Sequence, residues 1–348
     1  MYKRTLFIAS STILSLFVGF RWETGTDWNS YKSLFDSLEL NWTFLINVYH
    51  FDVGYVFFNA IVKFFTDNYT IFLCINSFVT FFFLSKLLLK LSPYPNLSLF
   101  FFYTNFMIAQ FMGSNRRMMA MVFILWSFYY IYKSHKKLTL LNLGLAFSFH
   151  RSSLINVITL FIPKTAIRTK WVLIILLVSL CIGLLQLPAK LIDILANLLS
   201  SLGNNPLVEK MLFYSENGKE HLVYSTGSLL LSTIFAVAKR SILLSFYIWI
   251  LKTHSVDRIT HFFYNIYIIG FAGYLLFIGS FFQMLTAYFT FIEIILIGRM
   301  YSYTAGRLKF AFCMLLFFYG LLQMANALNV YPDLYLPYLP FWTNIHRL

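Results

Sequence analysis

Residues 69–89, YTIFLCINSFVTFFFLSKLLL, contain a single charged residue, Lys86. A helix of roughly 20 apolar residues is long enough to cross the hydrocarbon core of a bilayer, which is about 30 Å thick. Comparable apolar runs are 5–20, 97–112, 117–132, 171–187, 229–251, 259–282, 285–298 and 310–328. This recurrence predicts a chain that crosses a membrane many times.

The composition supports the same interpretation. Hydrophobic residues make up 59% of the chain and charged residues 11%, and the mean hydropathy is +0.71. So few charged groups cannot solvate the surface of a water-soluble protein of this length. Lys and Arg outnumber Asp and Glu by 27 to 13, but much of the excess lies in short segments between apolar runs. This placement indicates membrane topology, and we expect no nucleic-acid partner.

Two apolar segments are too short or too interrupted for simple crossings. Residues 51–65 include Asp52, Asn59 and Lys63, so this segment is expected either to span or to be re-entrant. Residues 138–163 lie between two basic segments that the positive-inside rule places on one side. We therefore expect them to enter the bilayer and return, with Phe149-His150-Arg151-Ser152 at the far tip.

The fold class expected is an all-α polytopic membrane protein. It has about ten or eleven transmembrane helices, a re-entrant or interfacial segment and one larger external loop. No internal repeat or composition shift marks a boundary, so residues 1–348 are expected to form a single integral membrane domain, with external segments at about 21–50 and 188–228. Residues 5–20 are expected to stay as a first helix, because Phe20-Arg21-Trp22 offers no small-residue cleavage site.

Four polar clusters fall on the predicted outer face: residues 21–31, 52–55, 115–117 and 150–153. Charged residues that flank helices often serve only as anchors at the headgroup level, and this alternative stays open for each cluster. Arg116 and Arg117 begin an apolar helix, where the unpaired N–H groups and the helix dipole favour an anion. The guanidinium fork suits phosphate in particular.

His150 and Arg151 interrupt an apolar stretch, where ionisable groups are expensive unless they line water or a partner. Asp27 and Glu23 lie among Trp22, Trp28 and Tyr31, a mixture of carboxylates and aromatic rings typical of sugar binding. An amphipathic segment lying on the membrane would show the same mixture. Lys239 and Arg240 lie near the centre of an apolar run and require compensation, for which Glu293 is one candidate.

The three cysteines lie in apolar runs and suggest neither a disulfide framework nor a metal site. The usual motifs of zinc hydrolases, P-loop enzymes and serine hydrolases are absent from the sequence, and so is a DxD motif. We therefore expect no metal and no cofactor.

The ordered elements RWETGTDWNSYKSLF, FDVGYVFFN, GSNRRMMAMVFILWS and LAFSFHRSSLI resemble the EpsG-like group of Wzy-type polysaccharide polymerases, mainly over the first 165 residues. The elements that carry the resemblance are Gly25/Asp27/Tyr31, Asp52/Gly54/Tyr55, Arg116/Ala120 and Phe149/His150/Ser152. Such proteins more often have Glu at the position of Asp52. The C-terminal helices do not show the family's usual arginine, and Gln283 is the nearest candidate.

The resemblance implies an enzyme of the bacterial cytoplasmic membrane that joins polyprenyl-diphosphate-linked oligosaccharide repeats at the outer face, without a metal. Its partners would be the lipid-linked donor and acceptor, membrane lipids, a flippase and a chain-length regulator. The roles expected are diphosphate binding by Arg116, Arg117 and Arg151, catalysis by His150, Asp27 and Arg116, and sugar binding by Trp22, Trp28, Tyr31, Asp52 and Tyr55.

Two other classes of function stay open. A flippase for lipid-linked oligosaccharides would also be basic and polytopic, but it would more often show repeated halves. A transferase resembling O-antigen ligases would differ in its acceptor.

Overall fold

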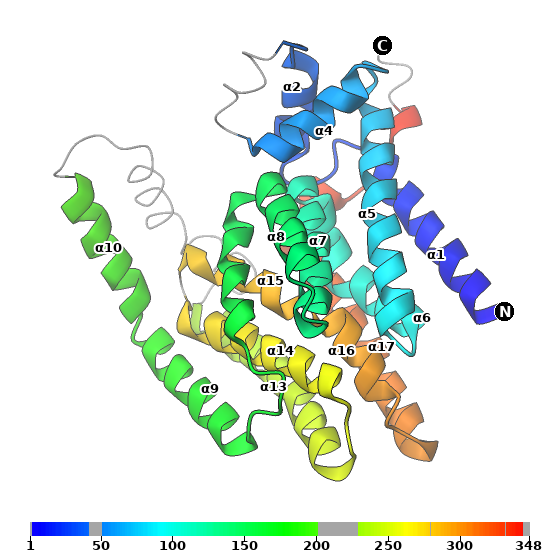
Figure 1. Cartoon of the computed structure of the whole chain (residues 1–348). Coiled ribbons are helices and arrows are strands. Elements are labelled where there is room, and N and C mark those ends of the chain that lie inside the picture. The colour runs from blue at the N-terminus through cyan, green and yellow to red at the C-terminus, as the bar shows by residue number, and fades with distance from the viewer. Residues whose placement is uncertain (1, 42–50, 201–228, 279, 331, 344–348) are drawn as a thin grey trace. The chain divides into compact units, whose positions relative to one another are not determined.

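The computed structural model describes residues 2–41, 51–200, 229–278, 280–330 and 332–343, and it is shown in Figure 1. The described parts of the predicted external segments are therefore 21–41 and 188–200, and the remainder lies outside the described residues. Regular structure in the described residues is helical apart from one short pair of strands. The chain divides into two compact units, residues 1–157 with 294–348 and residues 158–293. A single membrane domain stays a prediction.

The first unit contains most of the helices. Its elements are α1 (Tyr2–Gly19), β1 (Arg21–Trp22), α2 (Trp28–Ser37), α4 (Val53–Lys63), α5 (Tyr69–Leu91), α6 (Pro95–Phe102), the π-helix η1 (Tyr103–Met112), α7 (Asn115–Tyr132), α8 (Lys136–Phe149), α17 (Gly306–Val330), α18 (Pro332–Tyr335) and β2 (Leu339–Pro340). Helix α7 forms the core of the unit, because nearly all of its side chains are buried and it packs against α8 and α5.

The second unit is smaller. Its elements are α9 (Thr169–Leu184), α10 (Leu187–Ser200), α13 (Leu229–Thr253), α14 (Arg258–Leu276), the 3-10 helix η3 (Phe281–Thr286) and α15 (Ala287–Thr290). The 3-10 helix η2 (Arg151–Phe161) and α16 (Glu293–Tyr301) span the boundaries between the units. Gly183 lets α9 approach α14, because a Cβ at this position would overlap the carbonyl of Leu275.

Five helices in the described residues are long and apolar enough to cross a membrane: Tyr69–Leu91, Thr233–Thr253, Arg258–Leu276, Phe282–Tyr301 and Gly306–Val330. Shorter apolar helices are Val53–Lys63, Arg151–Phe161 and Thr169–Leu184. Large apolar side chains also face outward, including Leu322 at 73% exposed and Phe310 at 67%, as expected where lipid is the solvent. The protein is a multi-pass membrane protein, which confirms the predicted class.

Five membrane-length helices in the described residues are fewer than the ten or eleven crossings expected, because other predicted crossings are short or interrupted. Residues 97–112 form α6 followed by a π-helix. The predicted crossing 171–187 corresponds to the shorter helix α9. Residues 138–163 form two short helices, α8 and η2, with His150 between them in an extended conformation, and their entry into the bilayer and return stay a prediction.

Local chemistry defines several of these helix ends. Asn68 caps α5 by accepting hydrogen bonds from the amides of Thr70 (2.9 Å) and Ile71 (3.3 Å). Asp257 caps α14 through the amide of Thr260 at 3.1 Å. Pro95 begins α6, where its missing N–H removes no helical bond.

The intramembrane cations of the second unit have an acidic neighbour. The charges of Lys239 and Arg240 act on Glu293, and Tyr247 Oη donates to Glu293 Oε1 at 3.4 Å. Arg240 also lies over the ring of Tyr274, with its Cζ 3.7 Å from the ring centroid. Glu293 and an aromatic face are therefore the compensation that the sequence required.

Candidate functional site

The four polar clusters predicted from the sequence come together at one end of the first unit. Arg21 contacts Asn115, Tyr31 contacts Ser114, and Asp52 contacts both Arg116 and Arg151. Asp52 and Arg116 are 64 positions apart in the chain, and the residues of the other three pairs are 83 to 99 positions apart. The site is therefore assembled by tertiary packing of β1, α2, α4, α7 and the α8–η2 turn.

Asp52 is at the centre of this assembly. Its Oδ2 accepts a hydrogen bond from Arg116 Nη1 at 2.9 Å, and its Oδ1 accepts one from the backbone amide of Arg151 at 3.1 Å. The Nε of Arg151 lies 3.3 Å from the same oxygen. Burial raises the pKa of Asp52, and the two arginines oppose that rise. Because the side chain is 7% exposed, the carboxylate holds two arginines in place instead of facing solvent.

The arginines enter the site from the first turn of α7 and from the first residue of η2. The Nε atoms of Arg116 and Arg117 are buried and have no hydrogen-bond partner among the described residues. Buried donors normally find a partner. Unpaired guanidinium N–H groups at a helix N-terminus are therefore candidate donors to an anionic group.

His150 ends α8 and lies beside these cations. Its Nδ1 is 2.6 Å from Ser152 Oγ. Burial, with the charges of Arg116 and Arg117, lowers the pKa of His150 to about 3. The imidazole is therefore neutral at physiological pH. A base is most effective when its pKa is near the working pH, so His150 is a weak base until the neighbouring positive charge is neutralised.

The neutrality of His150 can be measured directly. Deuterium exchange at the imidazole C2–H, followed by mass spectrometry across pH, is expected to show no titration of His150 between pH 5 and 8 in the folded protein. In the denatured protein the midpoint should return to about 6.5, the ordinary value. A midpoint near 6.5 in the folded protein would contradict this placement.

The segment before α2 is fastened to the end of η1. Gly25 has a φ of +113°, and a Cβ there would overlap the carbonyl of Met112. The Oγ1 of Thr26 donates to the carbonyl of Gly113 at 3.1 Å, and the Asp27 amide donates to the same oxygen at 3.3 Å. The Gly-x-Asp element thereby fixes Asp27 next to the residues that lead into Arg116.

Tyr31 joins Asp27 to the start of α7. Its Oη donates to Asp27 Oδ2 at 3.0 Å and lies 2.6 Å from Ser114 Oγ. Burial and the charge of Asp27 raise the pKa of Tyr31, so its hydroxyl keeps its proton. Ser114 then donates to Tyr31, and the chain of bonds orients the Asp27 carboxylate.

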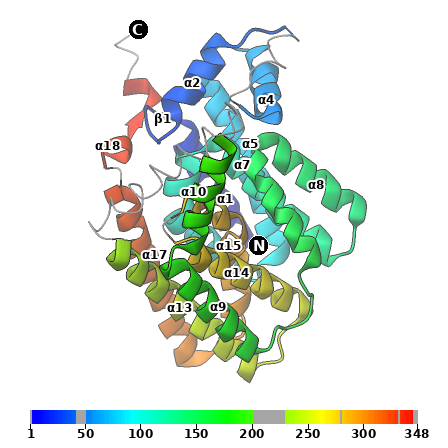
Figure 2. The same cartoon turned by 90° about the vertical axis from the view of Figure 1, so that its left-hand side faces the viewer.

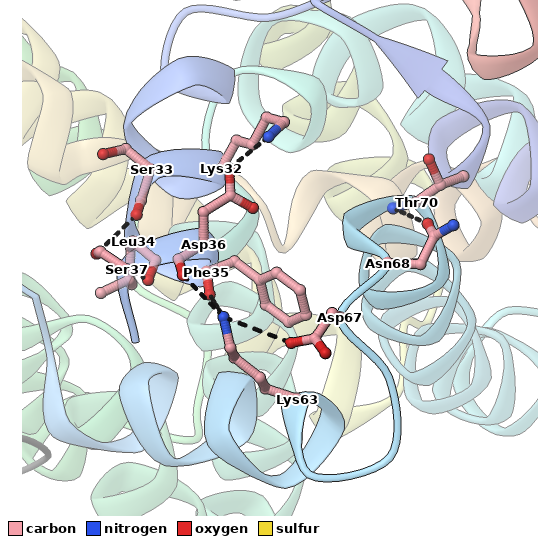
Figure 3. Close-up of polar contacts among 10 residues, drawn as sticks. All are labelled: Lys32, Ser33, Leu34, Phe35, Asp36, Ser37, Lys63, Asp67, Asn68 and Thr70. Atoms are coloured by element: carbon pink, nitrogen blue, oxygen red, sulfur yellow. Dashed lines mark hydrogen bonds and ion pairs between the residues drawn. The ribbon is translucent and has the colours of Figure 1, made fainter. Parts of the chain in front are cut away.

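Helices α2 and α4 are fastened together at the end remote from Asp52 (Figure 3). The Nζ of Lys63 donates to the carbonyls of Phe35 at 2.7 Å and Asp36 at 2.8 Å, and lies 3.7 Å from Asp67 Oδ1. A cation at these last carbonyls also complements the negative end of the α2 dipole. Lys63 thereby fixes the angle at which α4 presents Asp52.

A family model described as the EpsG family matches residues 4–339. The chain belongs to the EpsG family. The match extends well beyond the first 165 residues that carry the resemblance in the sequence. It links this membrane protein to exopolysaccharide synthesis. Neither the search of curated proteins nor that of solved structures finds a match.

The aromatic residues predicted to bind sugar are packed differently in this EpsG-family protein. Trp28, Tyr31 and Tyr55 are 3%, 2% and 0% exposed. Their rings contact one another or Trp22 and Tyr69 at centroid distances of 5.0–5.5 Å. Three of these rings thus pack against other rings, and sugar binding by them stays a prediction. Of the four aromatic residues, Trp22 alone keeps a partly exposed side chain.

Two features of the EpsG-family site were given no role from the sequence: Arg21, which lies within the predicted cluster 21–31, and the strand pair of β1 and β2. Arg21 is 1% exposed and donates to the Val18 carbonyl at 2.6 Å and to Asn115 Oδ1 at 2.5 Å. The C-terminal strand β2 pairs with β1, and Figure 2 shows β1 close to α18. The position of Arg21 directly after an apolar run was the sequence signal for a functional role of this residue. No local sequence feature indicated the pairing of β1 with β2.

A metal-binding cluster is not found in the described residues, where no group of three or more His, Cys, Asp or Glu side chains comes together. The polar groups at this site are the buried carboxylate of Asp52, the half-buried carboxylate of Asp27 with the Tyr31 hydroxyl that bonds it, the arginines described above and the neutral imidazole of His150. Such a set can hold a phosphate group and move a proton.

Proposed function

We propose that the chain is a polysaccharide polymerase that joins oligosaccharide repeats carried on a lipid diphosphate. The observation that carries the proposal is the placement of Arg116 and Arg151 on Asp52, with the charges of Arg116 and Arg117 acting on His150, in a membrane protein of the EpsG family. The donor and acceptor would both be polyprenyl-diphosphate-linked, and the reaction would take place at the outer face of a bacterial cytoplasmic membrane.

The reaction requires two kinds of protein group. A hydroxyl of the acceptor sugar attacks the anomeric carbon of the donor, the bond from that carbon to the diphosphate oxygen breaks, and the hydroxyl proton passes to a base. The lipid diphosphate leaves with additional negative charge. Cations fixed beforehand at this position stabilise the transition state more than the ground state. We assign the stabilisation of the leaving diphosphate to Arg117 and to the guanidinium N–H groups of Arg116 and Arg151 that do not contact Asp52.

His150 is assigned the base role, with Asp27 as the second candidate. A diphosphate on Arg116 and Arg117 would offset part of the charge that now lowers the pKa of His150. The pKa would then rise toward the range useful for catalysis. Substrate binding would thus activate the base. Asp27 accepts a hydrogen bond from Tyr31 at 3.0 Å, which orients its carboxylate.

The test is the length of the glycan on a gel, in a strain that lacks the native gene and carries a plasmid copy. Arg117→Gln is expected to reduce the ladder to single repeats, because one diphosphate-binding cation is removed while the Asp52 ion pairs stay intact. Arg307→Gln is the matched control, because Arg307 is an exposed arginine in the first turn of α17. A full ladder from Arg117→Gln would contradict the assignment.

The deletion strain itself separates the other functions. Single capped repeats support a polymerase. Lipid-linked units that accumulate inside the cell would indicate a flippase, and free polymer not attached to its acceptor would indicate a ligase.

A further inference from the structure

A basic cavity lies in the first unit, away from the Asp52 site. Its volume is about 820 Å³, within the range of small-molecule sites. Four cations line it: Lys3 and Arg4 from α1, and Lys86 and Lys90 from the end of α5. The cavity and the Asp52 site lie near opposite ends of helix α7. Lys90 of the cavity lies over Tyr129 near the C-terminal end of α7, whereas Arg116 of the Asp52 site lies in its first turn. Figure 1 shows the N-terminus of α1 at the end remote from α2 and α4.

The cavity has no acidic residue in its lining. The segments that form it also lack acids, since neither Asp nor Glu occurs in residues 1–22, 68–192 or 294–332. A further cation, Lys309, donates a hydrogen bond to the hydroxyl of Tyr94 in the lining and lies 4.5 Å from its ring centroid. Like charges gathered in one cavity repel one another unless an anion joins them.

The walls of the cavity are held in place by contacts among its own residues. Asn96 Nδ2 donates to the Lys3 carbonyl at 3.2 Å, which ties α1 to α6. The Nζ of Lys90 lies 4.7 Å from the centroid of the Tyr129 ring. Because Tyr94 accepts its bond from Lys309, its own O–H can donate to a ligand. The cavity therefore offers ammonium and guanidinium groups, a phenol and an amide, all suited to phosphate oxygens.

We propose that this cavity binds a phosphate-bearing anion at the headgroup level of the membrane, on the side opposite the Asp52 site. An anionic phospholipid supplies that group together with acyl chains for which Leu89 and Leu97 provide an apolar wall. Basic pockets between helices at this depth take anionic headgroups in other membrane proteins. A free phosphate compound offers the same chemistry without the acyl chains. The proposal does not depend on the polymerase function.

The test is native mass spectrometry of the full-length protein in detergent, titrated with phosphatidylglycerol or with phosphatidylcholine. The wild type is expected to retain phosphatidylglycerol in preference. Lys86→Gln/Lys90→Gln should weaken that binding at least tenfold, and Lys86→Arg/Lys90→Arg should keep it. Lys136→Gln/Lys137→Gln is the matched control, because these exposed lysines of α8 lie outside the cavity and should change binding less than twofold.

Competition with inorganic pyrophosphate distinguishes a phospholipid ligand from a soluble phosphate compound. Displacement of the lipid at low millimolar pyrophosphate supports a soluble phosphate compound as the ligand, and failure to displace it supports the lipid. Lys3→Gln/Arg4→Gln provides a second variant if the first does not fold, as judged by thermal unfolding in phosphatidylcholine. Equal effects of the cavity variants and the control variant on phosphatidylglycerol binding would overturn the proposal. The cations of the cavity would then serve only to set the orientation of the helices in the membrane.

Discussion

Replacement of Asp52 by asparagine is expected to abolish the polymer ladder, with a fall in the rate of polymerisation on the order of 100-fold, equivalent to about 2.7 kcal/mol. The neutral amide cannot form the ion pairs with Arg116 and Arg151. Both guanidinium groups would then be free to leave the geometry that the diphosphate requires. Small displacements of positioning groups have effects of this size.

The controls for this prediction are the same chemical change beyond the opposite end of α4 and a change at Asp52 that keeps the charge. Asp67→Asn makes an identical change at a side chain that is 90% exposed, and it should leave the ladder unchanged. Asp52→Glu keeps the charge and should retain most of the activity. The measurement is glycan length in the complemented deletion strain, with protein amounts checked by immunoblot. Polymer of normal length from Asp52→Asn would remove Asp52 from the site.

Substitution of Gly54 by alanine is expected to have the second largest effect, on both stability and activity. The new Cβ would overlap the side chain of Ser148 and lie 2.9 Å from its backbone carbon. The backbones of α4 and α8 are close together at this point. The overlap can therefore be relieved only if the two helices separate. Overpacking of this kind typically costs about 1–3 kcal/mol. The separation would also move Asp52 away from Arg151.

The matched control is Gly144→Ala in α8, where a Cβ meets nothing within 4 Å. Alanine in an open helical position should stabilise the protein by up to about 1 kcal/mol, because glycine is the poorer helix former. Both variants should be unfolded in detergent and followed by circular dichroism. Ser148→Gly should restore part of the stability of Gly54→Ala. Equal stability of the two alanine variants would show that α4 and α8 are not in close contact.

The membrane class was determined by the sequence, because hydropathy is a sum over neighbouring residues. The break at His150 was also predictable. There the basic segments on both sides of residues 138–163 required a return, and the structure places the turn between α8 and η2. The number of membrane-length helices was not predictable, because the π-helix after Phe102 leaves the local hydropathy nearly unchanged.

The clustering of polar residues on one face could be predicted from the sequence, but their pairings could not. The resemblance to EpsG-like proteins implied that Asp52 and Tyr55 bind sugar, which stays a prediction. The structure buries both and joins Asp52 to Arg116 and Arg151. Partners 64 to 99 residues apart are decided by helix packing. Local sequence thus determined that this chain lies in a membrane and belongs among EpsG-like proteins. Which charges compensate one another was decided only by the tertiary structure, because a buried charge requires a partner that only the folded chain can bring near it.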